Sequence, residues 1–205
     1  RNGMKIGILG TGMIVKALMK TIDRLDFSRA VVLGTKETEE ETARMCREHG
    51  LDGYFLDYDE LLESDVDTIY VALPNHLHAD FAKKALLHGK HVIIEKPITS
   101  NARQLRDLME TARERGRMIF EAMNIHYLPI FGQLREHLPD LGPIKIVTMD
   151  YGTFKLVSIG AKDCKAPVRC TIQGTDGCIV IAKPVNQMDS FELILNDGTV
   201  REYRT

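Results

Sequence analysis

A glycine-rich segment near the start of the chain constrains the fold most strongly. It lies between an apolar run and a helical pattern, and it reads G-I-L-G-T-G-M-I-V from residue 7 to residue 15. Gly10 permits a tight turn, and Gly12 lets the backbone approach a pyrophosphate that the following helix N-terminus stabilises. Val15 replaces the third glycine of the G-x-G-x-x-G pattern, which loosens the motif. The segment predicts a dinucleotide-binding turn, with an ordinary tight strand-to-helix turn as the alternative.

Strand and helix signals alternate from this turn to about residue 122. Short apolar strands separated by helices indicate a parallel sheet that is covered on both faces. Strands are expected at residues 5–10, 30–33, 54–55, 68–73, 90–95 and 117–122. Helices are expected at residues 13–25, 37–49, 58–63, 76–88 and 102–115, the last capped by Asn101 with Gln104 in a capping box. We therefore expect an α/β fold that begins with a doubly wound Rossmann domain over residues 1–122.

The pattern changes after Met123. One helix is expected at residues 127–138, and most later signals are those of strands. These strands are expected at residues 145–151, 154–159, 168–174, 178–182, 191–195 and 199–203. Asn196-Asp197-Gly198 is a tight hairpin signal. We expect residues 123–205 to form a C-terminal α+β domain with a mainly antiparallel open sheet.

Charge and composition narrow the range of partners. The chain has 27 basic and 29 acidic residues, no tryptophan and 6% aromatic residues, which argues against a nucleic-acid partner. No apolar run approaches the roughly 20 residues that span a bilayer, so no membrane partner is expected. The four cysteines form no C-x-x-C pair and match no zinc spacing. We expect reduced thiols, no metal site and a cytoplasmic location.

The end of the second predicted strand bears on the choice of cofactor. An acidic residue there bonds the adenosine ribose of NAD, yet this chain has no carboxylate before Glu37. Thr35 can donate a hydrogen bond, and Lys36 can pair with a 2′-phosphate. This segment favours NADP over NAD, and a solvated lysine at a helix start is the competing interpretation of Lys36.

Two further strand ends carry polar residues. One reads V-A-L-P-N-H-L-H from residue 71 to residue 78, and the other reads I-E-K-P from residue 94 to residue 97. Ligands in open α/β sheets bind outside the carboxyl ends of the strands, where both segments are expected to lie beside the glycine-rich turn.

The order of these three motifs resembles that of the Gfo/Idh/MocA oxidoreductases, which include glucose–fructose oxidoreductase and inositol 2-dehydrogenase. The resemblance implies that Lys96 contacts the substrate hydroxyl that becomes a carbonyl, and donates a proton or stabilises the alkoxide. It also implies that Glu95 bonds a nicotinamide ribose hydroxyl, that the bond before Pro97 is cis, and that His78 lies at the same rim. A helix-start cap or a solvated residue is the alternative for His78.

These motifs together give the expected site. The expected catalytic residues are Lys96 and His78. The expected cofactor-binding residues are Gly10, Thr11, Gly12, Met13, Ile14, Thr35, Lys36, Ala72, Leu73, Pro74, Asn75, His78, Glu95, Lys96 and Pro97.

The chain also departs from the family pattern. His126 stands where relatives carry an arginine, five residues after Glu121; a substrate contact and a plain rim histidine are both open. The family's helix with a D-x-x-x-H motif does not follow Met149, so we expect either a natural shortened variant or a segment missing near residues 149–150. The second domain is therefore expected to be an incomplete substrate and oligomerisation domain.

The resemblance implies a function in outline. We expect an NAD(P)-dependent dehydrogenase that transfers hydride between nicotinamide and a secondary alcohol or ketone of a sugar, cyclitol or diol-like small molecule. We also expect a homo-oligomer formed through the C-terminal sheet. The alternative is a non-catalytic nucleotide-binding regulator on the same fold, and a protein-interaction module is a third possibility.

Overall fold

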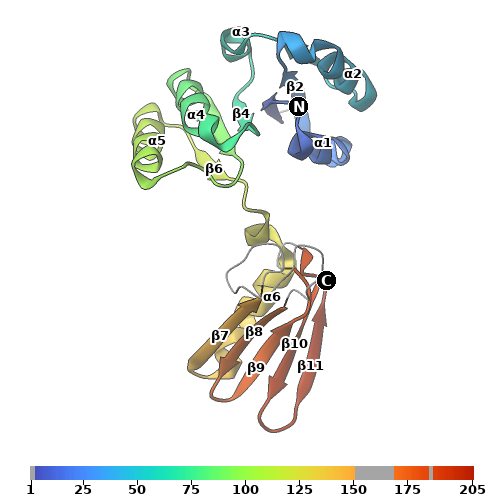
Figure 1. Ribbon diagram of the computed structural model, residues 1–205, viewed down its shortest axis with the longest axis vertical. Coiled ribbons are helices and arrows are strands. Elements are labelled where there is room, and N and C mark those ends of the chain that lie inside the picture. The colour runs from blue at the N-terminus through green and yellow to red at the C-terminus, as the bar shows by residue number, and fades with distance from the viewer. Residues whose placement is uncertain (1–2, 151–168, 185–186) are drawn as a thin grey trace, which may run out of the picture. The chain divides into compact units, whose positions relative to one another are not determined.

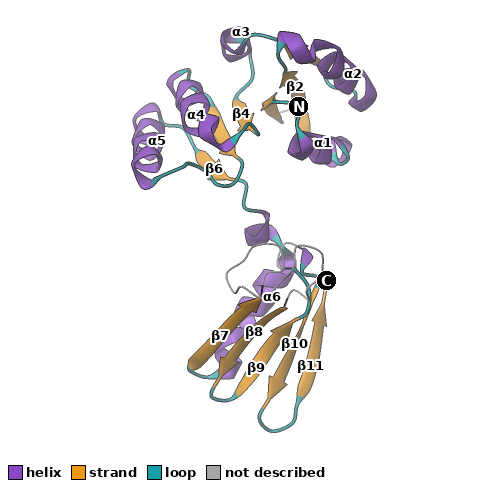
Figure 2. Ribbon diagram, in the orientation of Figure 1, coloured by secondary structure: helices purple, strands orange, loops and turns teal. Residues whose placement is uncertain are grey.

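The chain folds into two compact units, Arg1–Ala122 and Met123–Thr205. The structure is a computed structural model that describes residues 3–150, 169–184 and 187–205. The first unit holds a six-stranded parallel sheet and the second a five-stranded antiparallel sheet (Figures 1 and 2). The predicted fold class is confirmed, while the functions assigned to the two halves of the chain stay predictions.

The first unit is built around six parallel strands. They are β1 (Met4–Leu9), β2 (Phe27–Leu33), β3 (Gly53–Phe55), β4 (Thr68–Val71), β5 (His91–Ile94) and β6 (Ile119–Glu121). Their spatial order is β3-β2-β1-β4-β5-β6, so the direction in which strands are added reverses between β1 and β4. This is the strand order of a dinucleotide-binding sheet, in which the reversal point is where ligands bind.

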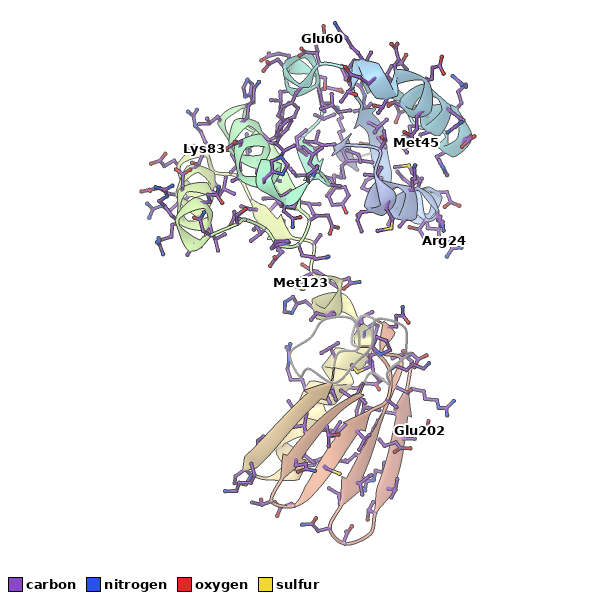
Figure 3. All side chains as sticks on the ribbon, in the orientation of Figure 1. Arg24, Met45, Glu60, Lys83, Met123 and Glu202 are labelled. Carbon is purple, nitrogen blue, oxygen red and sulfur yellow. The ribbon has the colours of Figure 1, made fainter. Side chains whose placement is uncertain are left out.

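Helices cover both faces of this sheet. They are α1 (Met13–Met19), α2 (Glu39–His49), α3 (Tyr58–Glu63), α4 (His78–Leu87) and α5 (Ala102–Arg115). Figure 1 shows α1 and α2 on one side of the sheet and α3, α4 and α5 on the other. Val15 of α1 and Met45 of α2 belong to one core cluster, whereas Leu61, Leu86 and Leu108 of the other three helices belong to another. Figure 3 shows Met45 among these packed side chains and Glu60 on the outside of α3. Because both faces are covered, all four residues of β4 are buried.

The ends of α5 follow the sequence signals. The Asn101 side chain accepts a hydrogen bond from the backbone N–H of Gln104, at 3.0 Å. The Gln104 side chain in turn accepts from the N–H of Ser100, at 3.1 Å, one residue before the position that a standard capping box uses. Gly116 ends the helix with a left-handed φ of 60°. The predicted span of 102–115 is confirmed.

Several helices are shorter in the structure than the sequence predicts. The helix expected at 13–25 ends at Met19, because both the N–H and the hydroxyl of Thr21 donate to the carbonyl of Leu18. The chain then makes a 3₁₀ turn over Ile22–Arg24, which buries Ile22. The predicted starts at residues 37 and 76 correspond to 3₁₀ turns, Lys36–Thr38 and Asn75–Leu77, that precede α2 and α4.

In the described part of the second unit, one α-helix lies against one face of the sheet (Figure 2). Ile130 and Leu134 of the helix pack on Ile179, Phe191 and Leu193. Its elements are a 3₁₀ turn (Asn124–Tyr127), α6 (Pro129–His137), a second 3₁₀ turn (Leu138–Leu141), β7 (Ile144–Asp150), β8 (Arg169–Gly174), β9 (Gly177–Ile181), β10 (Ser190–Leu195) and β11 (Val200–Arg204). The strand order is β11-β10-β9-β8-β7, and every adjacent pair is antiparallel.

The helix predicted at 127–138 begins later, at Pro129, which suits the first position of a helix. The strand predicted at 154–159, the segment expected to be missing near 149–150 and Cys164 lie at or beyond the edge of the described residues. Within the ranges that the structure describes, no helix combines the length and the apolarity needed to cross a bilayer.

Candidate functional site

The candidate site lies at the carboxyl edge of the parallel sheet, where four strand ends are joined by backbone hydrogen bonds. The N–H of Gly10, after β1, donates to the carbonyl of Leu33 at the end of β2, at 2.9 Å. The N–H of Glu95, after β5, donates to the carbonyl of Val71 at the end of β4, at 3.0 Å. These bonds join residues that are 23 and 24 positions apart in the sequence, and the pairing of β1 with β4 brings both pairs of strand ends to the same edge.

The glycine-rich turn has the geometry that its sequence predicts. Gly10 has a φ of +98°, and a Cβ on it would lie 3.2 Å from the carbonyl oxygen of Ala72, so only glycine fits there. Gly12 precedes α1, supplies no side-chain cap, and has no atom within 4 Å of the place where a Cβ would lie. Val15, which replaces the third glycine, is a fully buried residue of α1. The turn therefore tolerates this replacement and leaves open space beside Gly12.

The residues that follow Gly12 are apolar and uncovered. Met13 is 81% exposed and Ile14 is 40% exposed, although both begin a helix that buries Val15 and Met19. Thr11 is half-buried. An exposed apolar pair beside an open glycine turn is suited to contact with a bound molecule.

The segment after β2 is exposed and held mainly by its own turn. The N–H of Thr35 donates to the Thr38 hydroxyl at 2.9 Å, and Lys36 begins the 3₁₀ turn with its side chain exposed. The backbone N–H of Glu37 and the Thr35 hydroxyl hold the pKa of the Glu37 carboxyl below its usual value. A carboxylate is therefore present next to Lys36, although it lies beyond the end of β2, where an acidic residue selects NAD.

A second carboxylate reaches the turn through the tertiary structure. Glu41 of α2 forms an ion pair with Lys16 of α1, at 2.7 Å between Oε1 and Nζ. Lys16 is the main cause of the lowered pKa of Glu41, and a hydrogen bond from the Thr11 side chain contributes as well. The sequence analysis did not single out Glu41 or Lys16, because 25 residues separate them and neither belongs to a motif.

The segment after β5 carries Lys96. The Lys96 side chain is exposed, and its peptide bond to Pro97 is cis, as the family resemblance implies. Three neighbours fix the backbone around it: Val71 accepts from the N–H of Glu95, the carbonyl of Pro97 lies 2.9 Å from the His78 ring, and the N–H of Ile98 donates to the Glu121 carboxylate at 3.0 Å. The lysine side chain is thus free, while the backbone that carries it is fixed by neighbouring elements.

The Glu95 carboxylate is held by a residue that the sequence analysis missed. The Tyr70 hydroxyl donates to Glu95 Oε1 at 2.6 Å, and the backbone N–H of Lys96 donates to Oε2 at 3.3 Å. Burial, followed by the hydrogen bond to Glu95, raises the pKa of Tyr70, so the hydroxyl remains a donor at neutral pH. In the sequence Tyr70 looks like one more apolar strand residue, and only the pairing of β4 with β5 reveals its role.

The structure corrects the expected place of His78. This side chain is fully buried, rather than exposed at the rim or solvated at a helix start. Its Nε2 lies 2.8 Å from the carbonyl oxygen of Leu73, and its Nδ1 lies 2.9 Å from that of Pro97. Burial leaves no surface through which the imidazole could touch a substrate.

The remaining expected residues are distributed as follows. Ala72 and Leu73 are half-buried, and Pro74 and Asn75 are exposed, in the segment after β4. His126 is exposed and belongs to the 3₁₀ turn Asn124–Tyr127 of the second unit, so its contribution to a substrate site stays a prediction. Among the described residues, no group of three or more histidine, cysteine or acidic side chains is placed to hold a metal ion.

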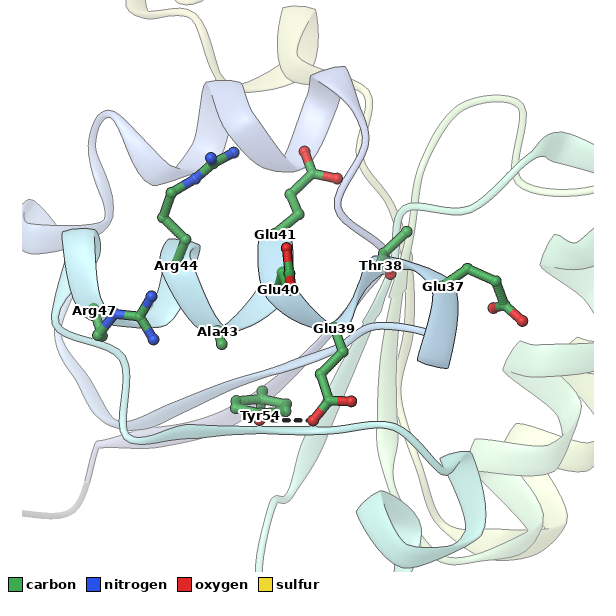
Figure 4. Close-up of a pocket in the computed structure, with 9 residues that line it drawn as sticks. All are labelled: Glu37, Thr38, Glu39, Glu40, Glu41, Ala43, Arg44, Arg47 and Tyr54. Atoms are coloured by element: carbon green, nitrogen blue, oxygen red, sulfur yellow. Dashed lines mark hydrogen bonds between the residues drawn. The ribbon is translucent and has the colours of Figure 1, made fainter.

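A separate hollow of about 690 Å³ lies between the start of α2 and β3 (Figure 4). Tyr54 donates to Glu39 across it, at 3.2 Å. Its lining is largely charged: Glu37, Glu39, Glu40, Glu41, Arg44 and Arg47. The hollow contains neither the glycine-rich turn nor Lys96, so we assign the candidate site from the strand ends instead.

Known proteins resemble this chain in sequence, most of all over the first unit. Residues 4–123 match the Gfo/Idh/MocA family, described as "Oxidoreductase family, NAD-binding Rossmann fold". The chain is 31% identical over 150 residues to scyllo-inositol 2-dehydrogenase (NADP(+)) IolU of Bacillus subtilis, covering 72% of this chain and 45% of the relative. It is 30% identical over 165 residues to D-xylose 1-dehydrogenase (NADP(+)) 2 of Haloferax volcanii, covering 79% and 50%.

A solved structure with a similar fold is that of KijD10, a 3-ketoreductase from Actinomadura kijaniata in complex with TDP-benzene and NADP. It superposes with a TM-score of 0.80 at 19% identity, covering 99% of this chain and 84% of the other. At this identity the likeness concerns the fold. The chain spans about half the length of the curated relatives that it matches.

Proposed function

Because this chain belongs to the Gfo/Idh/MocA family of oxidoreductases, we propose that it is an NAD(P)-dependent dehydrogenase or reductase acting on CH–OH groups. The observation that carries the proposal is Lys96: an exposed lysine whose backbone is fixed at the carboxyl edge of the sheet, near the glycine-rich turn. The substrate class is a secondary alcohol or ketone of a sugar, cyclitol or diol-like molecule. The resemblance to an inositol dehydrogenase and a xylose dehydrogenase supports this class.

The residues at the strand ends fit a dinucleotide. The open space beside Gly12 leaves room for a pyrophosphate at the backbone, and the exposed Met13 and Ile14 offer apolar contact. The segment Leu73–Asn75 borders the same edge. When bound, the nicotinamide supplies or accepts the hydride, and the protein's part is to bind, orient and manage the proton.

In this proposal, Lys96 carries out the proton transfer. A lysine Nζ at the reacting oxygen can donate a proton to the developing alkoxide or stabilise its charge. Glu95 accepts from a ribose hydroxyl, since its carboxylate is already oriented by Tyr70. His126, whose side chain is exposed, is a further proposed substrate contact.

We favour NADP over NAD as the cofactor. Lys36 can pair with a 2′-phosphate and Thr35 can donate to it, and both relatives named above carry NADP(+) in their names. Glu37 and Glu41 carry negative charge in the same region and oppose the binding of a 2′-phosphate there, so the preference for NADP depends on Lys36 and Thr35. A comparison of KM for NADPH and NADH tests it, and a large preference for NADH would contradict it.

We further propose that the first unit binds the cofactor and that the second unit serves substrate binding and oligomerisation. In this proposal, copies of the chain associate through the antiparallel sheet. The protein works in the cytoplasm on a small molecule. Light scattering of the purified protein measures the association. A monomer at all concentrations would contradict it.

Binding and turnover need separate measurements. We expect NADPH to bind, as followed by nicotinamide fluorescence, and to be oxidised with at least one compound in a panel of ketoses, inososes and dicarbonyls. Gly12→Ala is expected to weaken NADPH binding by filling the space beside the turn, whereas Gly132→Ala, which also adds a methyl group into open space, is the matched control. Binding without turnover on every compound would favour a nucleotide-binding regulator instead.

A further inference from the structure

The imidazole of His78 connects the two loops that frame the proposed site. It is the first residue of α4 and is fully buried. Nε2 lies 2.8 Å from the carbonyl oxygen of Leu73, just before Pro74, and Nδ1 lies 2.9 Å from that of Pro97, just after Lys96. One side chain therefore contacts the segment that borders the cofactor and the segment that carries the proton donor.

The chemistry of these contacts is directional. A backbone carbonyl oxygen can only accept a hydrogen bond, so each contact needs an N–H on the ring. The imidazolium form supplies two such groups and the neutral ring supplies one. Neither nitrogen is left facing solvent, and a ring that is fully occupied by backbone carbonyls is poorly placed to exchange a proton with a substrate.

Other contacts complete the frame around Lys96. The N–H of Ile98 donates to Glu121 at the end of β6, and the N–H of Glu95 donates to Val71 at the end of β4. Both of these bonds are to neighbouring strands of the sheet. Within the described part of the chain, His78 joins this segment to the loop after β4 rather than to a strand.

We propose that His78 is a positioning residue, which fixes the distance between the Leu73–Asn75 segment and Lys96 by bridging their carbonyl groups. The proposal rests on the proposed function, because it assigns the cofactor to one segment and the proton transfer to the other. Its energetic role is to hold the reacting groups in place before the substrate binds, and a misplacement of about 1 Å can cost a factor of about 100 in rate.

The bridge can be observed without any substitution. In protein labelled with ¹⁵N-histidine, we expect a His78 ring N–H signal that exchanges slowly with water, because the ring is buried and bonded. The exposed His76, two residues earlier, is the internal comparison and is expected to exchange rapidly. Rapid exchange of every His78 ring proton would overturn the proposal.

Substitution then tests the consequence. His78→Phe keeps an aromatic ring and removes both polar contacts, whereas His78→Gln keeps an amide group with two N–H donors. We expect kcat to fall by about 10- to 100-fold in His78→Phe and to recover in part in His78→Gln. The backbone N–H groups of Leu77 and Ile98 are expected to exchange faster in His78→Phe, while that of Ala112 in α5 is unchanged.

A matched control separates positioning from simple loss of stability. Thr111 is also buried, and its hydroxyl donates to the Asp107 carbonyl at 2.8 Å within α5, a helix that supplies no residue of the proposed site. Thr111→Val is expected to lower Tm and leave kcat unchanged. If His78→Phe is as active as Thr111→Val, or if its faster amide exchange is spread over the whole first unit, the positioning role is wrong.

The two proposals fail in different ways. If the wild-type protein binds NADPH but turns over no compound, the enzymatic function fails, while the slow ring N–H exchange and the localised amide exchange still report on the bridge. If the wild-type protein turns over substrate and His78→Phe matches it, the bridge is irrelevant to catalysis and the function stands. Should His78→Phe not fold, the wild-type ring exchange and His78→Gln decide the question.

Discussion

The segment after β5 and the segment after β2 lie at the same edge of the parallel sheet, yet the structure holds them differently. The β5 segment is fixed by contacts to β4, α4 and β6. The β2 segment is held largely by Thr35 and Thr38 within its own turn. A backbone held from three sides suits a group that must meet a reacting atom, whereas a locally held turn can change its side chains without disturbing the sheet.

This difference gives the two segments different expected roles. In the proposed enzyme, the β5 segment carries chemistry and the β2 segment carries cofactor preference. Substitutions after β5 should therefore act mainly on kcat, and substitutions after β2 mainly on the KM of the cofactor.

The largest expected effect is that of Lys96→Ala. Loss of the proton donor is expected to lower kcat by about 10²- to 10⁴-fold, because a positioned general acid contributes about that much. NADPH binding, measured by fluorescence, should change little. Lys96→Arg, which keeps a positive charge but changes the donor, should also be impaired. An unchanged kcat in Lys96→Ala would remove the distinction between the segments.

The next effect is that of Lys36→Ala on cofactor choice. Loss of one charge-assisted contact to a 2′-phosphate costs about 1.5 kcal/mol or more, which corresponds to about a tenfold rise in KM for NADPH. The KM for NADH and kcat should be unaffected. Lys20→Ala, at the other end of α1 from the glycine-rich turn, is the matched control. Equal changes for NADPH and NADH would mean that Lys36 does not read the 2′-phosphate.

A smaller effect is expected for Tyr70→Phe. The substitution removes one hydrogen bond to Glu95, worth about 1 kcal/mol, so activity is expected to fall about fivefold. Tyr58→Phe removes a similar hydroxyl that donates to Phe81 at 2.8 Å, and it should affect stability without affecting activity. If both variants lose activity equally, the orientation of Glu95 is not what Tyr70 contributes.

The smallest expected effect concerns how α2 is held near the glycine-rich turn. Lys16 lowers the pKa of Glu41, so the pair stabilises the folded state above the ordinary pKa of a glutamate, and this contribution is lost as the pH falls through the lowered pKa. Glu41→Gln should therefore lower Tm slightly at neutral pH and not at a pH below that value. Glu48→Gln, with its carboxylate 3.9 Å from Arg44, is the control. A Tm difference that persists in acid would exclude the ion pair as the cause.

The sequence predicted local features of the fold better than it predicted side-chain contacts. The glycine-rich turn, the cap at Asn101 and the residues after β4 and β5 are local features, because each depends on neighbouring residues and on the period of the apolar positions. Helix ends were less predictable: the bonds from Thr21 to Leu18 that end α1 compete with a helical pattern that continues to Leu25.

The sequence alone determined that this chain forms a doubly wound sheet followed by an antiparallel one, and it predicted a site where strands end in glycine, proline and lysine. Local geometry and apolar periodicity suffice for that, because both are properties of short stretches of chain. Only the tertiary structure decided which side chains support Lys96. Tyr70 reaches Glu95 through strand pairing, and His78 is buried between two loops instead of exposed at the rim. Near the glycine-rich turn, Glu41 of α2 pairs with Lys16 of α1 in the same way. Contacts of this kind join residues far apart in the sequence, and no short stretch of the sequence encodes them.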